Sequence, residues 1–213
     1  MTTLSESASK QLLSRYSVVL PQARVVATAD EVGAAAAEIG FPVVVKLNGD
    51  AIAHKTERGL VRLNVTSAAA AREAAAHLLA AVMPEDGAVS VLVAQQVRGA
   101  RELIAGVVRD PAFGPAVMLG VGGVLAEVIG DVAFRLVPLT EVDADELIDD
   151  LATQTLLGPF RGEPAVDRAA LRAVLLGLSL AAQENPHIVS IDMNPLIVCD
   201  GVPVAVDALV EIA

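Results

Sequence analysis

The stretch AAAAEIGFPVVVKLNGDAIAHKTERGLVRLNV, residues 34–65, decides the fold. Its alanine-rich beginning predicts a helix, with Asp30 just upstream as the N-cap. Val43–Leu47 is a continuous apolar run interrupted only by a lysine, which is typical of a strand buried on both faces. Residues 51–59 predict a polar loop, and Leu60–Val65 alternates between apolar and polar residues as a half-buried strand does. The stretch therefore predicts a helix followed by two strands that a loop connects.

The rest of the sequence alternates between helical and extended patterns. Further helices are expected at residues 5–16, 67–82, 141–157 and 165–185, and extended segments at 18–26, 90–97, 102–109, 115–119 and 126–136. A closing hairpin is expected to join residues 188–198 to 202–208. These patterns predict an α+β (α/β) fold with mostly antiparallel sheets, divided near a polar segment into two lobes, residues 1–95 and 96–213.

Composition limits the possible functions. The 213 residues are 54% hydrophobic and 19% charged, which suits a packed core and is too apolar for disorder. The net charge of -11 argues against nucleic-acid binding and against a polybasic membrane surface. The single cysteine, Cys199, excludes an intramolecular disulfide framework and a cysteine-based zinc site. The sequence has no signal-peptide core and no apolar run of membrane-spanning length, so we expect a cytoplasmic protein.

Two basic residues in the opening stretch are candidates for phosphate chemistry. Lys46 ends an otherwise apolar strand, where an ammonium group needs either an anionic partner, such as a phosphate, or a path to solvent at the strand end. His54 lies in the following loop beside Lys55, and a loop histidine can be a base, a nucleophile or a residue without a chemical role. The residues alone leave both alternatives open.

A second group of candidates lies in the C-terminal half. In the motif Asp192-Met193-Asn194-Pro195, Asp192 and Asn194 point to the same face if the segment is a strand, and their hard oxygen atoms suit Mg²⁺. The alternative is an Asx turn before the proline. The glycines Gly120, Gly122 and Gly123 either let the backbone approach phosphates or form a tight corner of a sheet.

Three segments, in this order, resemble the ATP-grasp subunits of ADP-forming acyl-CoA synthetases. They are residues 34–65, the stretch ARELIAGVVRDPAFGPAVMLGVGGVLAEVIGDVAFRLVPL at residues 100–139, and IVSIDMNPLIV at residues 188–198. The family includes acetate–CoA ligase and, more distantly, succinyl-CoA synthetase. The resemblance runs from Leu4 to Ala208 and implies an ATP-grasp fold, in which two lobes grip a nucleotide and the C-terminal lobe carries a metal-binding strand.

The resemblance also implies roles for individual residues. Lys46 would bind nucleotide phosphates, and His54 would carry phosphate between a histidine of a partner subunit and ADP. Asp192 and Asn194 would hold Mg²⁺. The other residues that the resemblance assigns to nucleotide binding are Lys10, the linker Gln95, Gln96 and Val97, the strand residue Glu102, the loop glycines Gly120, Gly122 and Gly123, and the adjoining Glu127. The linker has glutamines where the family usually has an acidic residue.

The implied reaction is the reversible conversion of acyl-CoA, ADP and phosphate to acid, CoA and ATP, catalysed by a carbon–sulfur-bond-forming ligase with ATP/ADP and Mg²⁺. A complete enzyme also needs a CoA-binding domain and a ligase domain. We therefore expect a nucleotide-binding subunit, or a separated domain, that works with a CoA-binding alpha-type partner; its oligomeric state and its acyl acid are open. The alternatives are a stand-alone ATP-grasp carboxylate ligase that forms an acyl-phosphate, and a non-catalytic nucleotide-binding regulatory module.

Overall fold

The computed structural model describes residues 2–50, 52, 58–123 and 126–213. The chain divides into two compact units. Unit 1 comprises Met1–Thr2, Ser9–Leu20 and Val97–Ala213, and unit 2 comprises Thr3–Ala8 and Pro21–Gln96. Residues 9–20 thus belong to the same unit as the C-terminal part of the sequence, whereas the predicted division placed them in the N-terminal lobe, residues 1–95. Both units contain an antiparallel sheet with helices, in agreement with the predicted α+β class.

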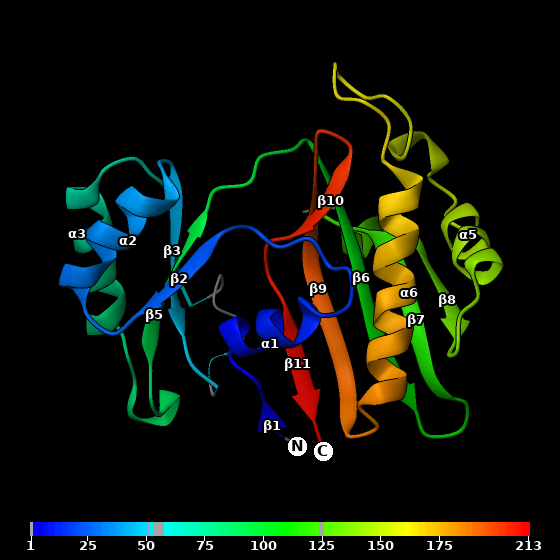
Figure 1. The fold of residues 1–213 in the computed structure, drawn as a ribbon, viewed down its shortest axis with the longest axis horizontal. Coiled ribbons are helices and arrows are strands. Elements are labelled where there is room, and N and C mark those ends of the chain that lie inside the picture. The colour runs from blue at the N-terminus through cyan, green and yellow to red at the C-terminus, as the bar shows by residue number, and fades with distance from the viewer. Residues whose placement is uncertain (1, 51, 53–57, 124–125) are drawn as a thin grey trace. The chain divides into compact units, whose positions relative to one another are not determined.

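Unit 2 is a four-stranded antiparallel sheet with two helices on one face. Its strand order is β2 (Ala23–Val26), β5 (Ser90–Gln95), β3 (Val43–Asn48) and β4 (Val61–Val65). The helices α2 (Ala29–Ile39) and α3 (Ala68–Ala80) pack against each other and against this sheet (Figure 1). A short 3₁₀ helix, Pro84–Asp86, precedes β5.

The central strand β3 explains the apolar run in the opening stretch. Val43, Val45 and Leu47 are fully buried in the core beneath the helices. The alternate residues of β3 lie on the opposite face and are also buried, so the prediction of burial on both faces is confirmed. A buried outer face on a sheet with helices on only one side requires another covering segment, which is described below.

Side chains near the helix starts explain where the helices of unit 2 begin. The hydroxyl of Ser67 accepts a hydrogen bond from the Ala70 N–H and so caps α3. The cap of α2 is Thr28 and not Asp30: the carboxylate of Glu31, three residues into the turn, accepts hydrogen bonds from the N–H groups of Ala27 and Thr28.

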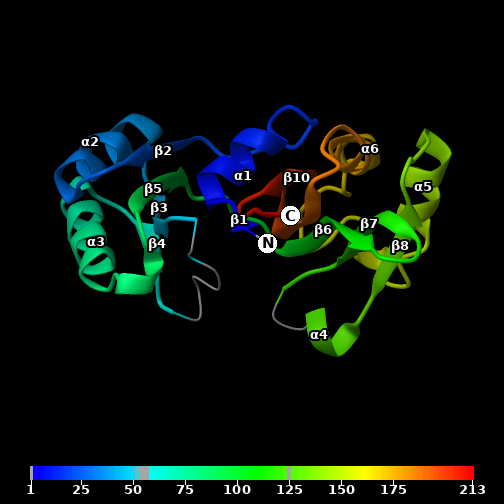
Figure 2. The ribbon, with the colours of Figure 1, turned by 90° about the horizontal axis from the view of Figure 1, so that it is seen from below.

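Unit 1 is built on a larger antiparallel sheet. In the described part of the chain its order is β1 (Thr2–Thr3), β11 (Leu209–Ile212), β9 (Ile188–Cys199), β6 (Arg101–Asp110), β7 (Gly114–Val121) and β8 (Val132–Leu136), and β10 (Val202–Ala205) also pairs with β9. The long helix α6 (Arg168–Glu184), beside α5 (Glu141–Asp149), lies on one side of this sheet. The short helix α4 (Ala126–Ile129) lies on the other side (Figure 2).

The N-terminal helix α1 (Glu6–Leu13) begins in unit 2 and ends in unit 1. The closing hairpin of β9 and β10 is as predicted. The carboxylate of Asp167 caps α6 by accepting hydrogen bonds from the N–H groups of Ala169 and Ala170. In the described part of the chain, no helix is both long enough and apolar enough to span a membrane.

Three segments of unit 1 differ from the sequence-based expectation. Residues 126–129 form a helical turn, whereas we expected a strand. The Gly130 N–H closes this turn by donating a hydrogen bond to the Ala126 carbonyl. The helix expected over 141–157 ends at Asp149, because the carboxylate of Asp131 binds the N–H groups of Ala152 and Thr153 and turns the chain. The four-residue strand β11 was not expected. Each of these differences arises from a tertiary contact or from a very short element, and neither produces a periodic pattern in the sequence.

Candidate functional site

Lys46 lies on the outer face of β3 and does not reach solvent. Its residue is only 6% exposed, and its Nζ donates a hydrogen bond of 2.8 Å to Oε1 of Glu6. Glu6 belongs to the first turn of α1 and is 2% exposed. The expectation that an ammonium in this position needs an anionic partner is therefore confirmed, and the alternative of a path to solvent is wrong. Its contact with a nucleotide phosphate stays a prediction.

The predicted adenine linker follows β5. The Gln95 N–H donates to the Gln22 carbonyl at 2.8 Å, and the Gln96 N–H donates to the Pro42 carbonyl at 3.2 Å. The side-chain oxygen of Gln96 accepts a hydrogen bond of 2.9 Å from the Asn64 N–H on β4. These two linker N–H groups are thus engaged within unit 2, so the predicted contact with adenine has to use other backbone groups of the segment or of Val97.

The predicted phosphate carrier His54 and its neighbour Lys55 lie outside the described residues, as does the side chain of Glu127. The residues that flank the His54 segment are well anchored in unit 2. Ile52 is buried in the core, and Arg58 forms two hydrogen bonds, of 2.7 and 2.9 Å, with the buried carboxylate of Asp86. The Arg58 guanidinium, together with the Met83 N–H, lowers the pKa of Asp86 to about 2.

Asp192 and Asn194 lie in the middle of β9. Burial alternates along this strand, and both residues are on its exposed face while Ile191 and Met193 point into the core. The prediction that the two polar side chains share one face is therefore confirmed. The alternative of an Asx turn is wrong, because the strand continues without interruption from Ile188 to Cys199.

A third polar residue near this face, Asp207, was not among the predicted ligands. It follows Val206, whose N–H donates to the Pro195 carbonyl, and precedes Leu209, which pairs with Asp192. The pKa of Asp192 is raised mainly by burial and in addition by the negative charge of Asp207. The available signal was a single aspartate within the otherwise apolar stretch at residues 202–210.

The donor set suits a hard divalent cation. Two carboxylates and one amide oxygen belong to the group of ligands that Mg²⁺ takes, and a cation would offset the repulsion between Asp192 and Asp207. Among the described residues, no three His, Cys, Asp or Glu side chains cluster in a way that would hold a metal. A metal at this place would therefore use Asn194 and oxygen atoms from a bound substrate in addition to the two carboxylates.

Lys10 holds the backbone directly beside Asp207. Its Nζ donates a hydrogen bond of 2.8 Å to the carbonyl of Val206, and the residue is 6% exposed. One residue earlier, the buried hydroxyl of Ser9 accepts a hydrogen bond from the Val210 N–H. The structure thus gives Lys10 a supporting role in unit 1, and its predicted contact with nucleotide stays a prediction.

The predicted glycine loop begins at Gly122, because β7 extends to Val121. Gly120 lies within β7, where a Cβ would come to 2.9 Å from a methyl group of Val132. Gly122 follows the strand and donates its N–H to the Glu102 carbonyl at 2.8 Å. Gly123 has a φ of 88°, which glycine adopts readily, and its position for a Cβ is 3.8 Å from a carboxylate oxygen of Glu102. Gly122, Gly123 and Glu102 therefore come together, and Gly120 serves the packing of the sheet.

The ATP-grasp domain family matches residues 1–212 of this chain. The beta subunit of ADP-forming acetate–CoA ligase I from Pyrococcus furiosus is 35% identical over 208 residues, which are 96% of this chain and 90% of that protein. The chain belongs to the ATP-grasp family of ADP-forming acid–CoA ligase subunits. The ADP-forming 4-hydroxybutyrate–CoA ligase of Nitrosopumilus maritimus is 34% identical over 92% of this chain, but over only 29% of its own length.

A solved structure of the same ATP-grasp family agrees over almost the whole chain. Acetyl-coenzyme A synthetase 1 of Ca. Korarchaeum cryptofilum superposes with a TM-score of 0.83 and is 34% identical, covering 98% of this chain and 92% of that one. That protein was solved with coenzyme A and Mg-AMPPCP, and with a phosphohistidine segment pointing towards its nucleotide-binding site. The expected ATP-grasp fold is thereby confirmed.

Proposed function

We propose that this chain is the nucleotide-binding subunit of an ADP-forming acid–CoA ligase and that it passes a phosphoryl group between a phosphohistidine and ADP. The observation that carries the proposal is the match to a separate beta subunit over nearly the full length of both chains. The face formed by Asp192 and Asn194 supports it, because the fold presents hard oxygen ligands there with Asp207 close by.

Mg²⁺, when bound, would neutralise negative charge on the phosphate oxygens during transfer. Asp192, Asn194 and Asp207 would hold it, since these residues provide the oxygen donors described above. Lys10 would support this arrangement by holding the backbone at Val206. Lys46 would provide positive charge to the nucleotide phosphates.

His54 would be the phosphoryl carrier. Its imidazole nitrogen would attack the phosphorus of a partner phosphohistidine, so that one N–P bond breaks as another forms. The β-phosphate oxygen of ADP would then take the phosphoryl group, which yields ATP and regenerates the free imidazole. Transfer of this kind depends mainly on positioning and on electrostatic stabilisation.

The partner would be an alpha-type subunit that binds CoA and carries the first phosphohistidine. The relative from Pyrococcus furiosus is named as a beta subunit, and in the longer ligase from Nitrosopumilus maritimus the matching region is a minor part of one chain. The acyl acid would be recognised largely by that partner.

The test combines the chain with a candidate alpha-type subunit and measures ATP formation from acyl-CoA, ADP and phosphate. The His54→Ala variant should lose phosphohistidine labelling of this chain and ATP formation, while its Kd for Mg-ATP stays within about twofold of the wild-type value. The matched control is His77→Ala, which removes an exposed histidine of α3 and should leave both properties unchanged.

Other outcomes would identify the alternatives. A His54→Ala variant that still ligates a carboxylate to an amine with ATP would indicate a stand-alone carboxylate ligase. Tight binding of Mg-ATP without turnover in the presence of any candidate partner would indicate a regulatory module.

A further inference from the structure

The segment Ser5–Ser7 covers the outer face of β3. Its three residues each contact a different residue in the alternating row Lys46, Asn48 and Asp50, of which the first two lie on β3 and the third lies just beyond its end. The contacts are Glu6 Oε1 with Lys46 Nζ at 2.8 Å, the Ser7 N–H with Asn48 Oδ1 at 3.1 Å, and the Ser5 N–H with Asp50 Oδ1 at 2.9 Å.

The spacing of this row makes the contact specific. Lys46 and Asn48 are two residues apart on one strand, so their side chains project to the same side. The amide of Asn48 is fixed in turn, because its Nδ2 donates a hydrogen bond of 3.0 Å to the hydroxyl of Ser90 on β5. The N-terminal segment is therefore held in one register on β3, and Glu6 is held over Lys46.

The buried ion pair of Glu6 and Lys46 is not explained by a contribution to stability alone. Two charges lose their hydration when they are buried, and well-packed apolar side chains of similar volume often serve stability equally well. Both members of the pair are nearly inaccessible to solvent, and they come from segments far apart in the sequence. The charge of this pair therefore points to a use other than packing.

We propose that Glu6 is a positioning residue for nucleotide binding, which acts by holding the ammonium group of Lys46 in place for a phosphate. This inference rests on the proposed function, in which Lys46 contacts the nucleotide. A lysine side chain is long and has many rotamers, so an unsupported Lys46 would lose conformational entropy when it binds a phosphate. The hydrogen bond to Glu6 fixes the position of the ammonium group before a phosphate arrives.

The test is a double-mutant cycle on the full-length chain, with Mg-ATP affinity measured by isothermal titration calorimetry. The variants are Glu6→Gln, Lys46→Met and the double substitution. Glu6→Gln should weaken Mg-ATP binding about tenfold, because the neutral amide holds the ammonium less firmly. Lys46→Met should weaken it more, and Glu6→Gln should have no further effect in the Lys46→Met background.

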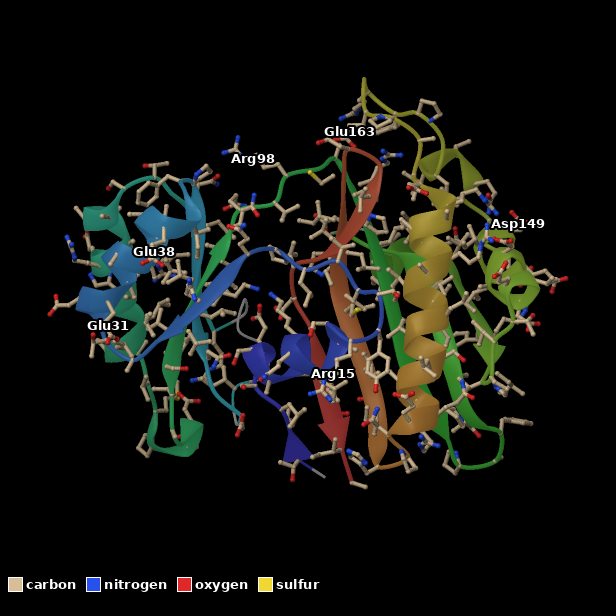
Figure 3. The ribbon with its side chains drawn as sticks, in the orientation of Figure 1. Arg15, Glu31, Glu38, Arg98, Asp149 and Glu163 are labelled. Carbon is tan, nitrogen blue, oxygen red and sulfur yellow. The ribbon has the colours of Figure 1, made fainter. Side chains whose placement is uncertain are left out.

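The matched control is Glu31→Gln. Glu31 is also a glutamate in the first helical turn of a unit 2 helix, and its carboxylate accepts two backbone N–H groups at 2.9 and 3.1 Å (Figure 3). This substitution should lower the melting temperature without changing the Kd for Mg-ATP. Circular dichroism of every variant verifies folding, and Glu6→Asp, which keeps the charge with a shorter reach, should give an affinity between those of wild type and Glu6→Gln.

The outcomes separate this inference from the proposed function. Wild-type affinity in Glu6→Gln together with weak binding in Lys46→Met would overturn the role of Glu6 and leave the proposed function standing. An equal loss from Glu6→Gln in both backgrounds would also overturn it, because Glu6 would then act independently of Lys46. Wild-type affinity in Lys46→Met would instead refute the phosphate contact on which the inference rests.

Discussion

The negative charge of Asp207 acts on Asp192 across two adjacent segments of unit 1. Burial is the larger cause, and the charge of Asp207 adds to it, so that the pKa of Asp192 lies above its ordinary value of 3.8. The fold therefore keeps the negative charge of Asp207 close enough to act on Asp192, in an arrangement that a divalent cation would relieve. Active sites commonly store unfavourable electrostatics of this kind at some cost in stability.

Asp192→Asn should remove this repulsion and also the metal ligand. A carboxylate with a raised pKa loses its stabilising contribution as the pH rises through the folded-state value. The melting temperature of the variant should thus exceed that of wild type near neutral pH, and the difference should disappear below the ordinary pKa of 3.8. Mg²⁺-dependent ATP formation should fall by about 100-fold or more.

Differential scanning fluorimetry over a pH series, with and without Mg²⁺, measures this effect. Added Mg²⁺ should raise the melting temperature of wild type but not that of Asp192→Asn. A variant that is less stable than wild type near neutral pH would contradict the prediction.

The ion pair of Arg58 and Asp86 should stabilise unit 2 above acid pH. Arg58 lowers the pKa of Asp86 from 3.8 to about 2, so the pair contributes stability above the unfolded-state value and loses it as the pH falls through about 2. Asp86→Asn should lower the melting temperature at neutral pH, and the gap to wild type should narrow between these two pKa values. A gap that is independent of pH over that range would show that the charge of Asp86 is not the cause.

Gly106 permits the close approach of β6 and β9 at the level of Asp192, with which it pairs. A Cβ at this position would collide with the Ile191 carbonyl oxygen. Gly106→Ala should therefore lower the free energy of unfolding by about 3 kcal/mol or prevent folding. In the control Gly158→Ala, the new Cβ would meet its nearest neighbour at 3.5 Å, an ordinary contact, so its cost should be below about 0.5 kcal/mol. Urea denaturation measures both values, and equal costs would refute the steric explanation.

Arg101 organises the segment between α5 and α6. Its buried guanidinium donates to the carbonyl groups of Leu156, Gly158 and Pro164 and pairs with Glu163, which Figure 3 labels. Arg101→Lys should cost about 2–4 kcal/mol of unfolding free energy, because a single ammonium cannot replace the planar fork. The control Arg161→Lys changes an exposed residue of the same segment and should cost less than about 0.5 kcal/mol. Chemical denaturation distinguishes the two, and a near-neutral Arg101→Lys would show that the carbonyl groups find other donors.

Much of the fold is predictable from local patterns in the sequence. The apolar run of β3, the Ser67 and Asp167 caps and the turn between β9 and β10 all depend on neighbouring residues. The alternation around Asp192 and Asn194 likewise predicted their shared face, because side chains two apart on a strand always project together. The short elements α4 and β11 were missed because four residues carry too little periodicity to identify them.

Local patterns in the sequence were enough to predict the family, most of the strands and helices in their order, and the residues that carry charge. Which of these charges meet depends on the tertiary structure. Glu6 pairs with Lys46, and Asp207 lies near Asp192, because strand pairing and helix packing bring together residues that are distant along the chain. Local sequence patterns contain no information about such contacts, whereas burial and Coulomb interactions depend on distance in space and fix the electrostatic character of each site.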